Sequence, residues 1–319
     1  MRTQSASGMP VPISRTTSFG TSHGSLCLGQ RSRGSQTIIP RSRNVCTALH
    51  SFAKLFEGVG NYVEHKRLLI HGLKLERERG NDYQVAQILM DLSDANRLMG
   101  LYEEGIHQGE ETLEIFERLG ETVGQAECLN YLAWLFYEDE QLEAAEEAAS
   151  HAINLIPEKD HQFQVCGSHR VLGNVYRSKG EREKAISHFE AALRIASSLG
   201  WHNQLFWAHF GLALLFSDED EFGDAYAHVE RAKSHAVDNT YHVGRAMELQ
   251  AGLCHKHHRL EESRSEASRA ADIFENLGAV KGMERCRELL RWIVEGIDNP
   301  VASGQLDPKC EFLQMVFTS

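Results

Sequence analysis

Four leucines recur at a fixed interval of 40 residues, and three further columns of residues keep the same step. The columns are Leu92, Leu132, Leu172 and Leu212; Phe136, Tyr176 and Phe216; Ala145, Ala185 and Ala225; and Ala152, Ala192 and Ala232. Because all four columns share one register, the chain contains an internal repeat, which constrains the architecture more than any local pattern does. Stacked repeats usually present a binding surface, so the pattern favours binding over catalysis.

Each repeat contains two helical stretches, and the segment 168–199 shows them most clearly. Its first stretch carries apolar residues at helical spacing up to Tyr176, and Gly180 then ends it. Its second stretch runs from Ala185 to Leu199, where Gly200 provides a helix stop. A single helix pair leaves apolar surface exposed, and neighbouring copies must cover it. We therefore expect an all-α fold, an α-solenoid forming a right-handed superhelix.

The residues of this repeat resemble the tetratricopeptide (TPR) consensus. The matching positions are Leu172, Gly173, Tyr176, Gly180, Ala185, Phe189 and Ala192, and in the preceding unit Leu132, Ala133, Phe136, Ala145, Ala149, Ala152 and Pro157. The 40-residue step exceeds the usual TPR period of about 34, as in the arrays of kinesin light chains. The stretch from Asp94 to Trp292 is also similar to TPR arrays of mushroom-forming fungi, which often follow a signalling NTPase domain. This chain contains no G-x-x-x-x-G-K-[ST] segment that would indicate such a domain.

The register divides the chain into three parts. Residues 44–297 are expected to form the solenoid, with about six units and a final capping helix at 283–297; the sixth unit fits after a two-residue deletion that aligns Leu260 with Phe222. Residues 1–43 contain no acidic residue and are rich in serine and arginine, so they predict a disordered basic arm. Residues 298–319 are expected to be a flexible tail.

Charge separates the arm from the repeats. The first acidic residue is Glu57, and seven basic residues precede it, whereas 45 acidic residues outnumber the remaining 26 basic ones. An acidic solenoid repels phosphate backbones, so no nucleic acid is expected as its ligand. Seven cysteines scattered without any C-x-x-C pair favour a cytoplasmic location. The arginine-rich, acid-free N-terminus leaves a mitochondrial transit peptide as the alternative. No stretch is apolar and long enough to predict a membrane span.

Three short motifs suggest catalysis or metal binding, but their contexts argue against them. Ser22 lies in a G-x-S-x-G match without the strand and helix that a nucleophile elbow needs. The acidic run 218–223 lacks two of the oxygen ligands of a calcium loop. His255 and His257 point in nearly opposite directions on a helix. We therefore expect no enzyme activity, no metal site and no cofactor.

The first helices of TPR units line a concave face, and this resemblance gives the candidate site. The positions that would project into the groove include Asn130, Trp134, Tyr137, Arg170, Asn174, Arg177, Trp207 and Phe210. Arginine and large aromatic residues dominate binding hot spots. The set fits a peptide that carries an acidic group between apolar anchors. It does not match the carboxylate clamp of chaperone-binding TPR domains, because Asp94 and Trp134 occupy clamp positions.

Two functional hypotheses remain open at this point. The first is an intracellular scaffold or adaptor, probably not needing a second copy of itself, that binds a partner protein or peptide in the groove as a monomer. The alternative is the sensor or regulatory arm of a STAND-type signalling NTPase whose NTPase domain is lacking here. A P-loop reading frame next to this one in the genome would favour the second.

Overall fold

The described part of the chain is built from helices alone. The computed structural model describes residues 62–157, 161–236 and 239–298, which all belong to one compact unit, Pro40–Ser319. Its helices are α2 (Tyr62–Arg79), α3 (Asp82–Leu98), α4 (Tyr102–Leu119), α5 (Thr122–Glu138), α6 (Leu142–Leu155), α7 (Gln162–Ser178), α8 (Arg182–Leu199), α9 (His202–Asp218), α10 (Phe222–His235), α11 (Thr240–Lys256), α12 (Leu260–Leu277) and α13 (Val280–Asp298). The predicted all-α class is confirmed for these residues. The predicted basic arm, the C-terminal tail and Ser22 lie outside them.

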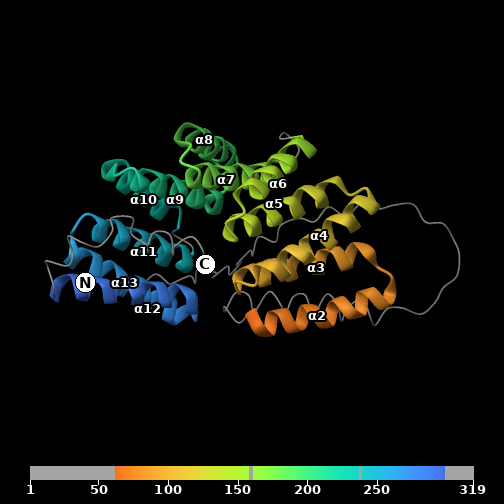
Figure 1. Cartoon of the computed structure of the whole chain (residues 1–319), viewed down its shortest axis with the longest axis horizontal. Helices are drawn as coiled ribbons and strands as arrows, with labels where there is room; N and C mark the ends of the chain where they lie inside the picture. The colour runs from red at the N-terminus through yellow and green to blue at the C-terminus, as the bar shows by residue number, and fades with distance from the viewer. Residues whose placement is uncertain (1–61, 158–160, 237–238, 299–319) are drawn as a thin grey trace, which may run out of the picture. The chain divides into compact units, whose positions relative to one another are not determined.

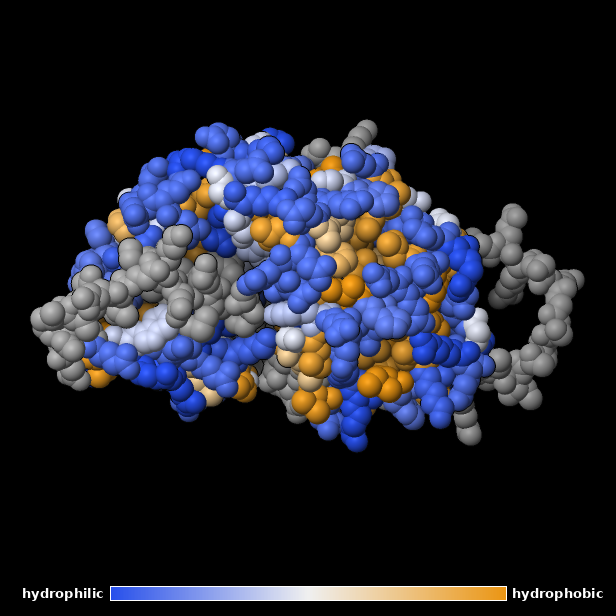
Figure 2. Space-filling view, viewed as in Figure 1, coloured by the Kyte–Doolittle hydropathy of each residue, from blue (hydrophilic) through white to orange (hydrophobic). Residues whose placement is uncertain are grey.

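The helices stack in the order of the sequence. Each odd-numbered helix from α3 to α11 packs against the even-numbered helix that follows it and against the next odd-numbered helix. Figure 1 shows these pairs along a curved path, with the odd-numbered helices α5, α7 and α9 following one another. The outer face in Figure 2 is covered mainly by hydrophilic side chains, with apolar ones between them. A helical-repeat solenoid is the architecture that the 40-residue step predicts.

The repeated columns are buried where the register places them. The leucines at 92, 132, 172 and 212 have at most 3% of their surface exposed, and the alanines at 145, 185 and 225 have none. Ala152, Ala192 and Ala232 are equally buried. Small side chains at these positions let neighbouring helices approach closely. The repeat in the sequence is thus a repeat of packing positions.

A left-handed backbone residue ends nearly every described helix, and these residues recur every 20 positions through most of the array. Glycine occupies six such positions, from Gly80 with φ 66° to Gly278 with φ 68°. Glu140, Asp220 and His258 take the same conformation at turns between paired helices, with φ near 60°. The step from Asp220 to His258 is 38 residues, which confirms the predicted two-residue deletion in the sixth unit.

Close packing between helices explains the Leu172-Gly173 pair. The ring of Phe189 on α8 lies so close to α7 and α9 that a Cβ added to Gly173 would come within 2.7 Å of it, and one added to Gly211 within 2.4 Å. Real Cβ atoms do not approach a ring so closely. Phe189 is fully buried as a result, and it joins three helices of two successive units.

The two ends of the array differ from the expectation in detail. The only described helix of unit one is α2, since residues 44–61 lie outside the described ranges. The last helix begins at Val280, three residues before the expected Met283. It is more than a solvating cap, because Cys286, Leu289 and Ile293 on it are fully buried. No described helix is both long and apolar enough to cross a membrane.

Candidate functional site

The odd-numbered helices enclose a cavity of ≈ 720 Å³. Its lining residues come from α2, α3, α5, α7, α9, α11 and α13 and from the turns beside them. They are Val63, Asp94, Arg97, Leu98, Met99, Tyr131, Trp134, Tyr137, Glu138, Arg170, Asn174, Asn203, Trp207, Phe210, Gly211, Tyr241, Arg245, Ala279, Val280, Lys281, Gly282 and Arg285. The size is typical of pockets that hold a small ligand or a short peptide segment. Five basic side chains but only two acidic ones line it.

One wall carries an ion-pair network that joins α3 to α5. Arg97 lies 2.8 Å from the Asp94 carboxylate and 2.6 Å from that of Glu138. Burial disfavours the charge of Arg97, but these two carboxylates outweigh it and raise the pKa of the guanidinium. Burial also raises the pKa of Glu138. The second carboxylate oxygen of Glu138, Oε2, has no hydrogen-bond partner in the described structure.

The opposite wall carries a second network, between α11 and α13. The carboxylate of Glu248 is fully buried behind this wall, and its Oε1 accepts a 2.5 Å hydrogen bond from Nε of Arg285. Its Oε2 accepts from Arg245 at 2.9 Å. Both arginines are thus paired with one carboxylate. A buried charge without a partner would destabilise the fold, and Glu248 therefore holds α13 against α11.

Aromatic side chains form the middle of the cavity. Trp134 and Tyr137 on α5 pack edge to face with ring centroids 5.9 Å apart, and Trp207 and Phe210 on α9 do the same at 5.5 Å. Arg170 on α7 lies between these two groups, 5.4 Å from the Trp134 ring centroid and 6.0 Å from that of Trp207. Its Nη1 donates a 2.5 Å hydrogen bond to Oε1 of Gln204.

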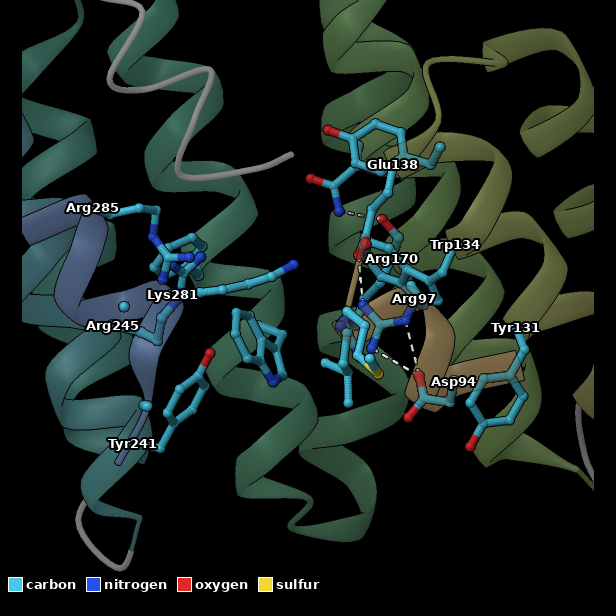
Figure 3. Close-up of a pocket in the computed structure, with 18 of the residues that line it drawn as sticks. Asp94, Arg97, Tyr131, Trp134, Glu138, Arg170, Tyr241, Arg245, Lys281 and Arg285 are labelled. Carbon is cyan, nitrogen blue, oxygen red and sulfur yellow. Dashed lines mark hydrogen bonds and ion pairs between the residues drawn. The ribbon is translucent and has the colours of Figure 1, made fainter. Parts of the chain in front are cut away.

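The first and last units of the array approach each other across this cavity. In Figure 3, Tyr241, Arg245, Lys281 and Arg285 lie on one side and Asp94, Arg97, Trp134 and Arg170 on the other. The side chain of Lys281 extends from α13 toward the opposite side. A Cβ placed on Gly100 would come 3.9 Å from the Lys281 Nζ. Burial lowers the pKa of Lys281, although the charge of Glu138 partly offsets this.

The structure brings six of the eight candidate groove residues into one lining: Trp134, Tyr137, Arg170, Asn174, Trp207 and Phe210. Asn130 and Arg177 are not part of it. The amide of Asn130 donates to the Gln164 carbonyl at 2.9 Å. Arg177 lies 2.6 Å from the Asp218 carboxylate and also donates to the Tyr137 hydroxyl. Arg177 therefore ties α7 to α9, and Arg170 alone of the two arginines faces the cavity.

Several lining residues were missed by the sequence analysis, although the register contained a signal for them. Arg97 lies 40 residues before Tyr137, and Arg245 lies 38 residues after Trp207, the step that the deletion requires. A further 40 residues lead from Arg245 to Arg285 and from Tyr241 to Lys281. Extending the groove columns through the last helix would have found the second wall.

The cavity offers groups for binding anions and hydrogen-bond donors. The surplus of basic side chains attracts an anion, the aromatic rings provide apolar contact, and Glu138 and Asn174 provide acceptor oxygens. Nowhere in the described ranges do three or more His, Cys, Asp or Glu residues gather in a group that could hold a metal ion. This arrangement suits recognition of a ligand by several weak contacts at once.

Comparisons with known proteins support the repeat assignment. The family model for the tetratricopeptide repeat matches residues 84–158, which span α3 to α6. The chain contains tetratricopeptide repeats. A comparison with curated protein sequences gave no match. The likeness to arrays of mushroom-forming fungi therefore stays a prediction.

Solved TPR-type structures resemble the array in fold. A Rap protein complexed with competence and sporulation factor matches with a TM-score of 0.59 and 11% identity, over 81% of this chain and 78% of that chain. Aspartyl phosphate phosphatase F from Bacillus subtilis matches with a TM-score of 0.56 and 10% identity, over 80% and 72% of the two chains. BtubC (BKLC) from P. vanneervenii matches with a TM-score of 0.52 and 22% identity, over 62% and 82%. At these identities the likeness concerns the fold alone.

Proposed function

We propose that this TPR protein is a non-enzymatic scaffold or adaptor that binds a peptide segment of a partner protein inside the cavity. The enclosed lining of aromatic and basic side chains on successive odd-numbered helices supports this most strongly. Arginine and tryptophan are the residue types that dominate binding hot spots when they lie in a desolvated centre. The Rap structure, which has a similar fold, was determined with a bound factor.

The test is recovery of partners with the full chain as bait, followed by affinity measurement on purified partners. Trp207→Ala removes a ring that contacts Phe206, Phe210 and His242 at the cavity centre. We expect it to weaken binding by about 2 kcal/mol or more. Phe163→Ala is the matched control, because Phe163 is 54% exposed and does not line the cavity. Partners that bind a folded Trp207→Ala variant at wild-type strength would place the binding surface elsewhere.

The second candidate, a regulatory arm of a STAND-type signalling NTPase, would use the same cavity as a sensor. It differs in what it requires from the genome, namely a P-loop reading frame adjacent to this one. Sequencing of full-length transcripts distinguishes the two, since a sensor arm would appear fused to that frame. The charge surplus in the cavity is compatible with either function.

A further inference from the structure

Arg170 differs from the other arginines of the cavity in having no carboxylate beside it. Arg97 is paired with Asp94 and Glu138, and Arg245 and Arg285 share Glu248. Within the described ranges, the contacts of the Arg170 guanidinium are Gln204 Oε1 and the faces of Trp134 and Trp207. Its charge therefore lies between two rings at the centre of the lining, without an acidic partner in the solenoid.

Such a position costs stability unless a ligand compensates for it. Burial lowers the pKa of Arg170 to about 10, and no carboxylate counters this effect. In a chain with a net charge of −12, an acidic residue could easily have been placed nearby. A charged group that is kept desolvated and unpaired in a cavity is typical of a binding site, where a ligand supplies the missing charge.

The rest of the lining indicates what else the ligand carries. Oε2 of Glu138 and Oδ1 of Asn174 are buried acceptors without a hydrogen-bond partner in the described structure. Both residues line the same cavity as Arg170. A peptide supplies backbone N–H donors as well as carboxylates, whereas a free phosphate group or a nucleic-acid backbone supplies acceptors and negative charge only. Paired donors and a carboxylate in one ligand therefore fit a peptide best.

We propose that Arg170 binds the carboxylate of a short peptide and so decides which peptides the cavity accepts. This inference rests on the proposed function. The planar guanidinium, held between Trp134 and Trp207, presents its donors in the fork that matches a carboxylate. Lys281 on α13 adds a second positive charge from the opposite side. The carboxylate comes from a C-terminus or from an Asp or Glu side chain, and both present the same chemistry.

The experiment offers the purified full chain four pools of random N-acetylated hexapeptides. The pools combine a free or amidated C-terminus with the presence or absence of Asp and Glu, and retained peptides are quantified by mass spectrometry. We expect strong retention from pools that contain a carboxylate and weak retention from the amidated, acid-free pool. Preference for a free C-terminus assigns the carboxylate to the chain end, and preference for internal Asp or Glu assigns it to a side chain.

Variants at position 170 then test the contact itself. Arg170→Gln keeps a hydrogen-bonding side chain without charge, and we expect it to reduce retention of the carboxylate pools about tenfold or more. Arg170→Lys keeps the charge but not the fork, and should restore part of the retention. Arg264→Gln is the matched control, because Arg264 is exposed on α12 and does not line the cavity. The melting temperature of Arg170→Gln without peptide should stay equal or rise, because a desolvated charge has been removed.

The outcomes separate the inference from the function on which it rests. Equal retention of the amidated, acid-free pool, or unchanged retention by Arg170→Gln, would leave peptide binding standing and overturn the role of Arg170. A clear fall in the melting temperature of Arg170→Gln would show that the residue is structural, which also overturns the proposal. If the wild-type chain retains none of the pools, peptide binding in this cavity is itself wrong.

Discussion

At the scale of single residues, the turns between paired helices store strain at three places. Glu140 is exposed, has a φ of 61° and occupies the turn position that Gly180 fills in the next unit with a φ of 72°. A side chain with a Cβ in this conformation costs about 1 kcal/mol relative to glycine. The strain at Glu140 serves no contact that would repay it in the described structure.

Exchanging the two residues gives a reciprocal prediction. Glu140→Gly should raise the free energy of unfolding by about 1 kcal/mol, and Gly180→Glu should lower it by a similar amount. An added Cβ at Gly180 meets no atom within 4 Å, so a clash does not confuse the second change. Urea unfolding of both variants measures the effect. Two changes of the same sign would contradict a cause in backbone strain.

At the scale of helices, the alanine column marks the closest contacts. Ala192 on α8 is fully buried among Ala126, Cys166 and Ala208, which belong to α5, α7 and α9. Ala192→Arg forces a long charged side chain into this contact, and we expect a loss of several kcal/mol from overpacking and burial of charge. Glu190→Arg on the exposed face of the same helix is the control. Thermal melts that coincide for the two variants would mean that α8 packs by another face.

Histidine pairs join paired helices in two successive units. The Nδ1 atoms of His169 and His188 lie 2.9 Å apart, and those of His209 and His228, each 40 residues further on, lie 3.0 Å apart. Burial, and then the neighbouring positive charges, lower the pKa of His169, His209 and His228 to about 4. Arg194, Arg231 and Lys184 add to this effect, while Glu146 and Asp224 oppose it.

These pairs predict acid sensitivity of the array. Because the folded-state pKa lies below the ordinary 6.5, the unfolded chain takes up more protons between these values. Stability should therefore be complete above about pH 6.5 and fall as the pH approaches about 4. The combined variant His209→Gln and His228→Gln should flatten this dependence in urea unfolding, whereas the exposed His107→Gln should not. Parallel curves for the wild type and the combined variant would rule out the pairs as the cause.

The extent to which the sequence predicts helices and site follows from where each property resides. The columns at Leu172 and Ala192 predict buried faces because one repeat determines its own packing. The histidine pairs at 169 and 209 obey the same register and could have been found in it. In contrast, the pairing of Arg177 with Asp218 depends on the rotation between α7 and α9. That rotation is a property of the contact between units, which periodicity does not specify.

At the scale of the whole array, the cavity itself illustrates this limit. Its two walls come from units about 150–190 residues apart in sequence, such as Arg97 and Lys281. Small rotations between successive repeats add up along a solenoid and set its curvature. No local pattern contains that sum, so the sequence predicted a groove on α5, α7 and α9 but not the second wall that α11 and α13 supply.

The last prediction asks whether this approach of the two ends stabilises the array. Ending the chain after Gly278 removes α13 and exposes Phe274, which is fully buried and would contact a Cβ at Gly282 within 2.7 Å. It also removes Lys281 and Arg285 from the cavity. Because repeats contact mainly their neighbours, hydrogen exchange should accelerate in α11 and α12 while α5 to α8 keep their protection. Peptide retention should be lost at the same time. Loss of protection throughout α5 to α8 would instead show that closure across the cavity holds the array together as one cooperative unit.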